Sequence, residues 1–200
     1  MMTEKVLVNA PICVCAVDPG STGAVVRIGR GRFDILRDFK KLRDIADSVS
    51  LLATGVDAAI IEDVHAMPGQ GVCSMFSFGR ATGVAFGALF QSLPPTAPLL
   101  EVAPLRWQNF FRREMGVDRS IPFDSRQLAA RLFPSFSQAY LLREKDHNTA
   151  DAIMLASYWL LLSPEECSEL LHAQTVAAEP KKRRKRVRSS PEASEGGTSQ

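Results

Sequence analysis

Two short apolar runs, each closed by a carboxylate, limit the folds open to this chain more than any other feature. Residues 12–17 lead into Asp18, and residues 57–61 lead into Glu62. Both runs have the length and composition of buried strands. A carboxylate at the end of a buried strand is costly without a partner, and neither acid has an adjacent basic residue. The pattern predicts an α/β fold that gathers charged groups at one edge of a sheet.

The order of apolar runs and turns predicts a mixed five-stranded sheet flanked by helices, in one domain over residues 1–173. After residue 173 the chain soon loses its apolar residues, so 174–200 are expected to form a disordered basic tail. Strands are expected at 12–17, 24–28, 33–39, 57–62 and 99–102. Helices are expected at 40–53, 74–92, 104–111, 126–133, 150–162 and 164–173.

The charge of the chain is unevenly distributed. Residues 180–200 hold seven of the 24 Lys and Arg residues but only two of the 22 Asp and Glu residues. The rest of the chain is therefore slightly acidic and could not hold DNA by bulk attraction. Any binding of nucleic acid must therefore depend on local basic clusters and bound metal ions.

The cysteines and the apolar segments indicate in which cellular compartment the protein resides. The four cysteines lack zinc-type spacing, and we expect buried thiols in a reducing compartment, with Cys13 and Cys15 on one face of a strand. No stretch is expected to span a bilayer, so no membrane partner is predicted.

A third acid, Asp151, opens an amphipathic helix in the segment DHNTADAIMLA. If the first and fourth strands are neighbours, Asp18 and Glu62 meet at one sheet edge, and Asp151 can reach that edge. Oxygen ligands of this kind suit Mg²⁺, with Mn²⁺ as a substitute. Two cations about 3.5–4 Å apart would serve an in-line phosphoryl displacement.

Two neighbours of Asp151 are further candidates. His147 precedes it by four residues, so the two side chains would share a helix face, and His147 could ligate metal or carry a proton. Asp146 is a second candidate ligand just outside that first turn.

The segments DPGSTG, IEDVHAMPGQGVCSMFSFGRATGVAFGAL and HNTADAIMLA resemble the RuvC-type Holliday junction resolvases of the ribonuclease H-like superfamily. The likeness is greatest to the phage and organelle branches, and it covers about residues 12–162. The resemblance implies a ribonuclease H-like fold. It also implies a homodimer, because two sites related by a two-fold axis are needed to cut opposing strands.

By this resemblance Asp18 would bridge two metal ions, with Glu62 and Asp151 as further ligands. Bacterial members place an acid or a histidine where this chain has Asn148, so His147 or Asp146 would have to supply the fourth ligand. His65 falls where the family has an aromatic residue that stacks on the junction, which makes it a candidate DNA contact. An ordinary loop histidine is the alternative.

The expected helix 74–92 carries one charged residue, Arg80, and is apolar nearly all round, so we expect it to be buried on most sides. Gly79, Gly83 and Gly87 form a bare stripe along it, which implies close backbone approach. Packing against the sheet and a dimer seam both explain the stripe.

Basic residues that follow the fifth strand are candidate phosphate contacts, notably Arg106, Arg113 and Arg126. The tail run KKRRKR includes Lys182 and Arg183, which could raise general DNA affinity or act as a nuclear localisation signal. The protein would then be nuclear, whereas a bacterial or phage protein would be cytoplasmic.

The sequence therefore predicts a Mg²⁺-dependent, structure-selective endonuclease that cleaves four-way or other branched DNA. A binding protein of the same fold with reduced turnover is one alternative, supported by Asn148. An actin- or hexokinase-like phosphotransferase is another, because DPGSTG also resembles the first phosphate loop of those proteins. A wider substrate range, including flaps, forks and packaging intermediates, also fits the resemblance.

Overall fold

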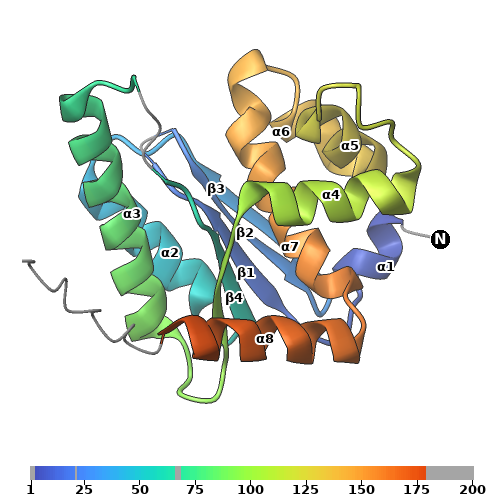
Figure 1. Ribbon diagram of the computed structural model, residues 1–200, viewed down its shortest axis with the longest axis horizontal. Coiled ribbons are helices and arrows are strands. Elements are labelled where there is room, and N and C mark those ends of the chain that lie inside the picture. Colours follow the sequence, from blue (N-terminus) through green and yellow to red (C-terminus); the bar gives the residue numbers. More distant parts are fainter. Residues whose placement is uncertain (1–2, 21, 66–68, 179–200) are drawn as a thin grey trace, which may run out of the picture.

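A mixed five-stranded sheet forms the centre of the molecule (Figure 1). The computed structural model describes residues 3–20, 22–65 and 69–178. The strand order is β3-β2-β1-β4-β5, in which the first three strands are antiparallel and β1, β4 and β5 run parallel. The strands are β1 (Val14–Asp18), β2 (Ala24–Gly29), β3 (Arg32–Arg37), β4 (Ala58–Glu62) and β5 (Leu99–Val102).

Helices cover both faces of the sheet (Figure 1). On one face lie α2 (Leu42–Ala53) and α3 (Val72–Ser92), which pack against each other. The other face is covered mainly by α7 (His147–Leu161), which contacts β1, β2 and β4. The remaining elements are α1 (Glu4–Val8), α4 (Pro104–Met115), α5 (Ser125–Leu132), α6 (Pro134–Tyr140), the 3₁₀ turn η1 (Glu144–Asp146) and α8 (Pro164–Ala178).

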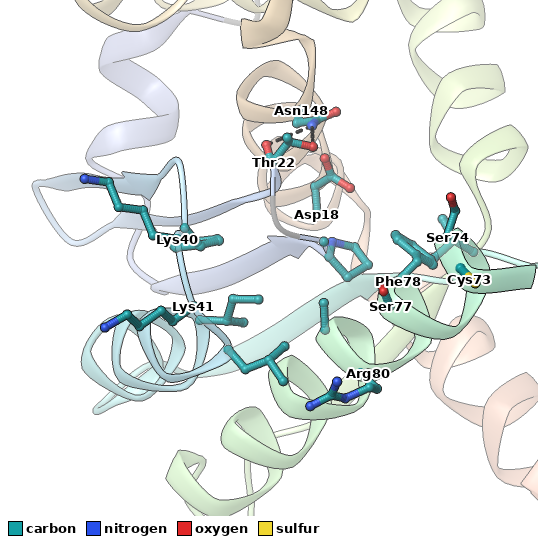
Figure 2. Close-up of a pocket in the computed structure, with 17 residues that line it drawn as sticks. Asp18, Thr22, Lys40, Lys41, Cys73, Ser74, Ser77, Phe78, Arg80 and Asn148 are labelled. Atoms are coloured by element: carbon teal, nitrogen blue, oxygen red, sulfur yellow. Dashed lines mark hydrogen bonds between the residues drawn. The ribbon is translucent and has the colours of Figure 1, made fainter. Parts of the chain in front are cut away.

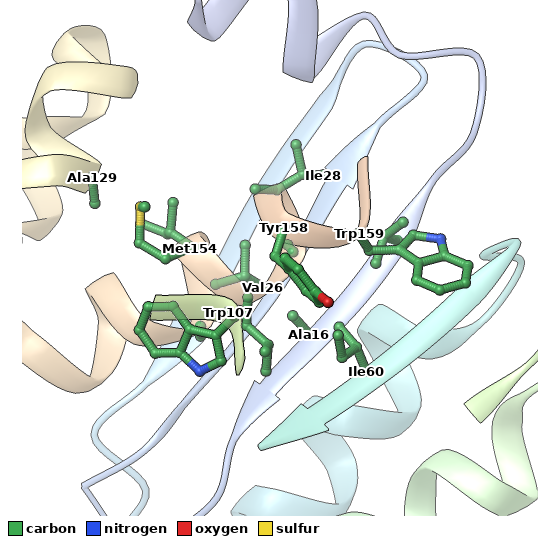
Figure 3. Close-up of a cluster of buried hydrophobic side chains, with 14 of the residues drawn as sticks. Ala16, Val26, Ile28, Ile60, Trp107, Ala129, Met154, Tyr158 and Trp159 are labelled. Atoms are coloured by element: carbon green, nitrogen blue, oxygen red, sulfur yellow. The ribbon is translucent and has the colours of Figure 1, made fainter. Parts of the chain in front are cut away.

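Strand alternation divides the core into two layers. Side chains along a strand point alternately to opposite faces of the sheet. In β1, Val14 and Ala16 join the layer beneath α7, whereas Cys15 and Val17 join the layer beneath α2 and α3. Figure 3 shows residues of the first layer, in which Tyr158 lies near Ile60 and Trp107 lies near Met154.

The structure confirms the predicted fold class and all five strands, with shifts of a few residues at their ends. The thiols of Cys13 and Cys15 are buried and free, and burial raises the pKa of Cys15 to about 12. Two helices, α1 and α6, were not predicted. The helix expected at 126–133 ends before Pro134, and this proline fits the first turn of α6 because it has no N–H to lose there.

The expected burial of the long helix is wrong. Only Ala81, Ala85 and Leu89 of α3 are buried. Phe76 and Phe90 are 69% and 75% exposed. A Cβ atom added at any of Gly79, Gly83 and Gly87 would have no neighbour within 4 Å among the described residues. The stripe does not pack against the sheet, because α3 meets its neighbours through its alanine side.

The expectation that no segment could span a membrane also needs correction. By length and composition alone, α3 could cross a bilayer. The glycines, serines and single arginine of α3 leave its mean hydropathy at 1.2 over an 18-residue stretch, and the helix is 21 residues long. This is weak support for a membrane span, because α3 packs on α2 as part of the layer over the sheet.

Candidate active site

Asp18 and Glu62 lie at the same edge and on the same face of the sheet. Residues two positions earlier, Ala16 and Ile60, belong to the core layer beneath α7, so alternation directs both acids to that side. Each acid is the last residue of its strand, and β1 and β4 are parallel neighbours. The two side chains are 8% and 9% exposed.

The third acid reaches this edge from α7. Asp151 lies in the second turn of that helix and is half-buried. Its carboxylate accepts a hydrogen bond from the side chain of Ser125, the first residue of α5. Three segments far apart in the chain thus bring Asp18, Glu62 and Asp151 within electrostatic range of one another.

The environment of these acids resists ionisation. Burial raises the pKa of Asp18 well above its usual value, and the charges of Glu62 and Asp151 raise it further. Burial and the charge of Asp151 raise the pKa of Glu62 from 4.5 to about 7. Burial also raises the pKa of Asp151. Within the described ranges, none of the three forms an ion pair, so their charge lacks a protein counterion.

This donor set fits a hard divalent cation by its chemistry, because carboxylate oxygens are the ligands Mg²⁺ prefers. The carboxylates are not, however, drawn together to coordination distance. Across residues 3–20, 22–65 and 69–178, no three His, Cys, Asp or Glu side chains are close enough to hold a metal ion as they stand. The carboxylates would have to move toward a bound cation.

Two hydrogen-bond donors to these acids were missed by the sequence analysis. Trp107, fully buried on α4, donates its indole N–H to Oε1 of Glu62 at 3.0 Å. Its ring packs edge-on against Phe123 with centroids 5.3 Å apart, in the segment that leads to Ser125. Trp107 could have been found, since a tryptophan on the apolar face of a helix usually needs an acceptor. Nothing in the sequence marks Ser125 as the partner of Asp151.

His147 and Asn148 lie at the start of α7. His147 is exposed, and its charge lowers the pKa of Asp151, as expected for a shared helix face. The amide nitrogen of Asn148 donates to the backbone oxygen and Oγ1 of Thr22, at 2.8 and 2.9 Å. Asn148 therefore holds the turn after Asp18, and its amide oxygen is the side-chain atom suited to coordinating a cation.

Asp146 does not join the three acids. Its carboxylate is 2% exposed and pairs with Arg37 at 2.9 Å and with Arg143 at 2.6 Å. Although burial alone would raise it, the hydrogen bonds from Arg143 and the charge of Arg37 hold the pKa of Asp146 below its usual value. The expected role as a metal ligand gives way to a structural one, because both arginines already neutralise this carboxylate.

The predicted DNA contacts are dispersed. Arg106 and Arg113 line a cavity of about 310 Å³ between α4, α7 and α8 that includes none of the three acids. Arg113 pairs with Glu114 at 2.9 Å, and Arg126 is half-buried on α5. The side chain of His65 is 75% exposed, with Nδ1 3.2 Å from Oδ1 of Asp63. Lys182 and Arg183 lie outside the described residues, as do all residues after 178.

A cavity of about 720 Å³ opens beside Asp18 (Figure 2). The turn after β1, the segment before α2, the first turns of α3 and the start of α7 surround it. Lys40 and Lys41 lie on one side of it, and Ser74, Ser77 and Phe78 on the other (Figure 2).

No protein-family model and no curated protein matches this sequence. Solved structures of Holliday junction resolvases do resemble the chain. RuvC of Thermus thermophilus is 15% identical, with a TM-score of 0.49, over 74% of this chain and 92% of that one. The same protein in complex with a Holliday junction substrate is 12% identical, with a TM-score of 0.48, over 74% and 91%.

The yeast mitochondrial Holliday junction resolvase Ydc2 is 10% identical, with a TM-score of 0.50, and the match covers 84% of this chain and 83% of that one. At such low identity the likeness concerns the fold. The chain has a ribonuclease H-like fold. Within that class, its fold is that of the RuvC-type resolvases.

Proposed function

We propose that this protein is a Mg²⁺-dependent endonuclease that hydrolyses phosphodiester bonds in four-way or branched DNA and acts as a homodimer. The observation that carries the proposal is the meeting of three buried or half-buried carboxylates at one sheet edge, none of them in an ion pair with a described residue. The acids are ordered along the chain as in the family whose motifs the sequence resembles. The fold shared with a junction resolvase supports the same activity.

Asp18, Glu62 and Asp151 would hold the cation, with Mn²⁺ able to replace Mg²⁺. Bound divalent ions supply an activated water and charge stabilisation at the leaving oxygen. Trp107 and Ser125 orient two of the carboxylates through the hydrogen bonds described above. His147, exposed at the start of α7, is placed to exchange a proton with solvent near Asp151.

The exposed face of α3 supports the homodimer. Phe76 and Phe90 project from a helix whose glycine stripe is open, and a second copy could approach that backbone closely. A two-fold axis along this helix would relate two active sites, which suits a four-way junction because opposing strands must be cut together.

Substitution of Asp18 by Asn tests the chemistry. We expect cleavage of a synthetic four-way junction to fall at least a thousandfold while junction binding persists, because the variant loses a metal ligand but no basic residue. Asp47→Asn is the matched control, since Asp47 is an exposed acid paired with Arg43 on α2. An Asp18→Asn variant that cuts as fast as the parent would refute the assignment.

One observation favours a binding protein with reduced turnover. Asn148 stands where bacterial relatives have an acid or histidine, and the carboxylates are not at coordination distance. Metal-dependent nicking by the parent protein would exclude this alternative. The phosphotransferase alternative needs a second Gly-rich phosphate loop, and nucleotide hydrolysis without DNA cleavage would favour it.

A further inference from the structure

We infer that the cavity beside Asp18 binds the sugar-phosphate backbone of the DNA strand being cut, next to the scissile phosphate, through Lys40, Lys41 and Arg80. This inference rests on the proposed nuclease function. The three cations come from two elements, the start of α2 and the third turn of α3, and all line one cavity with Asp18. Figure 2 shows Lys40 and Lys41 on one side of the pocket, with their ammonium ends directed away from Asp18, and Arg80 on α3, so the flexible lysine side chains would turn toward a bound strand.

Lys40, Lys41 and Arg80 are among the basic side chains that no acid neutralises in the described part of the chain, and they are the ones that line the cavity beside Asp18. Many basic side chains in the described part of the chain are neutralised by acids: Arg27 by Asp34, Arg43 by Asp47, Arg113 by Glu114 and Glu166, and both Arg143 and Lys145 by Asp38. The charge of Lys40, Lys41 and Arg80 is therefore available to an anionic ligand.

The segment that carries the two lysines is held in place at the rim. The carboxylate of Asp44 accepts hydrogen bonds from the backbone N–H groups of Lys40 and Lys41, at 2.9 and 3.0 Å. Asp44 thus bonds to the backbone of the two lysines and not to their ammonium groups. The lysine side chains thus extend from an ordered turn at the start of α2, which reduces the entropy lost on binding.

The remaining lining can accommodate a phosphodiester. Ser74 and Ser77 contribute hydroxyl donors, and Asp18 is the sole carboxylate among the described lining residues. A volume of about 720 Å³ lies within the range of small-molecule sites, so a nucleotide unit can enter. Asp18 lines the cavity, whereas Glu62 and Asp151 do not, so a strand crossing it would place one phosphate near Asp18 and the neighbouring phosphates at the basic residues.

The overall charge makes such a local site necessary. Outside residues 180–200 the chain has more acidic than basic residues, so general attraction cannot hold DNA near the acids. Arg106 and Arg113 line a separate cavity. The unpaired cations beside Asp18 are therefore better placed than those arginines to hold the strand at the site of cleavage.

The test compares Lys41→Gln/Arg80→Gln with Lys5→Gln/Arg131→Gln, a control that removes two exposed cations lining none of the cavities described above. Affinity for a labelled four-way junction is measured without divalent metal at several salt concentrations. Loss of two phosphate contacts should reduce the salt slope by about 2. Between about 50 and 200 mM salt the parent should therefore lose about tenfold more affinity than the cavity variant.

A second arm locates the contact. Methylphosphonate is placed singly at each phosphate flanking the cut, and Mg²⁺-dependent cleavage is measured. We expect one or two positions to slow the parent and the control, but to slow the cavity variant no further. A cavity variant with the salt slope and interference pattern of the parent would overturn the inference.

The two proposals fail separately. If the parent cleaves the junction, but the salt dependence of affinity is the same in the cavity variant and the control, the strand-binding site is refuted and the nuclease is not. If the salt dependence of affinity falls in the cavity variant, but the parent does not cleave, the nuclease is refuted and the strand-binding site remains.

Discussion

The indole of Trp107 orients Glu62. Trp107 donates to Oε1 from a fully buried position, and this hydrogen bond opposes the rise in the pKa of Glu62 that burial causes. An outer hydrogen bond of this kind fixes a ligating carboxylate before metal arrives.

Trp107→Phe keeps an aromatic ring but removes the donor. We expect the half-saturating Mg²⁺ concentration for cleavage to rise about tenfold, and the pH profile to shift toward higher pH, because Glu62 becomes harder to ionise. Cleavage rates across pH and Mg²⁺ provide the measurement.

Phe123→Leu is the control, since it alters the packing on Trp107 without touching the hydrogen bond. A pH profile unchanged in Trp107→Phe would show that the indole serves packing alone.

Glu62 also makes stability depend on pH. Its pKa in the folded protein, about 7, exceeds the ordinary 4.5, so the folded state retains a proton that the unfolded state releases. Stability without metal must therefore fall as pH rises from about 4.5 to 7, by up to about 3 kcal/mol from this group. The pKa values of Asp18 and Asp151 are shifted in the same direction.

Glu62→Gln should remove much of this dependence. We expect parent and variant to melt at similar temperatures near pH 5, and the variant to be more stable at pH 8, in chelator. Thermal melts of both proteins between pH 5 and pH 8 measure this difference in stability. Equal pH dependence in both proteins would contradict the assigned burial of Glu62.

At the scale of elements, Asp146 joins three segments. Arg37 at the end of β3 donates to Asp146 and to the backbone oxygens of Ala139 and Tyr140 on α6. Arg143 donates to the same carboxylate from the turn before α7. The network thus fixes the approach to the helix that carries Asp151.

Asp146→Asn should lower the free energy of unfolding by about 2 kcal/mol, because two arginines lose a buried counter-charge. Cleavage well below the melting temperature should remain within a few-fold of the parent. Chemical denaturation and a Mg²⁺ titration of cleavage separate the two effects. Unchanged stability with a large rise in the Mg²⁺ requirement would restore the role of metal ligand.

The exposed face of α3 leads to a prediction about assembly. Phe76→Ser/Phe90→Ser should convert a dimer into a monomer, since both phenyl rings stand in solvent beside the open glycine stripe. Sedimentation of parent and variant measures the change.

Ile121→Ser/Leu142→Ser removes two exposed apolar side chains elsewhere and should leave the dimer intact. A parent that sediments as a monomer at every concentration would contradict the dimer interface along α3. A parent that floats with lipid vesicles would show instead that α3 binds membranes, as its length and composition allow.

For the whole molecule, local sequence patterns predicted the strands, whereas the meeting of the acids also required β1 and β4 to be neighbours, as the structure shows them to be. The apolar runs ending at Asp18 and Glu62 specify strands, and alternation then fixes the face on which the carboxylates lie. Asp151 followed from its place at the start of an amphipathic helix.

Other features depend on contacts that no local pattern encodes. The environment of Asp146 is set by Arg37, more than a hundred residues away in the chain. The exposure of α3 reflects which helices share a layer, and composition alone cannot distinguish a core helix from one left open for a second copy. Likewise, the lack of ion pairs at Lys40, Lys41 and Arg80 can be seen only when the positions of the described acidic residues in the folded protein are known.

Strand-resolved cleavage of a mobile four-way junction by the parent protein, with Mg²⁺ varied, is the decisive measurement for the proposed nuclease. We expect paired nicks at symmetric positions in opposing strands, absent in chelator and abolished by Asp18→Asn. A junction that is bound but stays intact at every Mg²⁺ concentration would contradict this proposal.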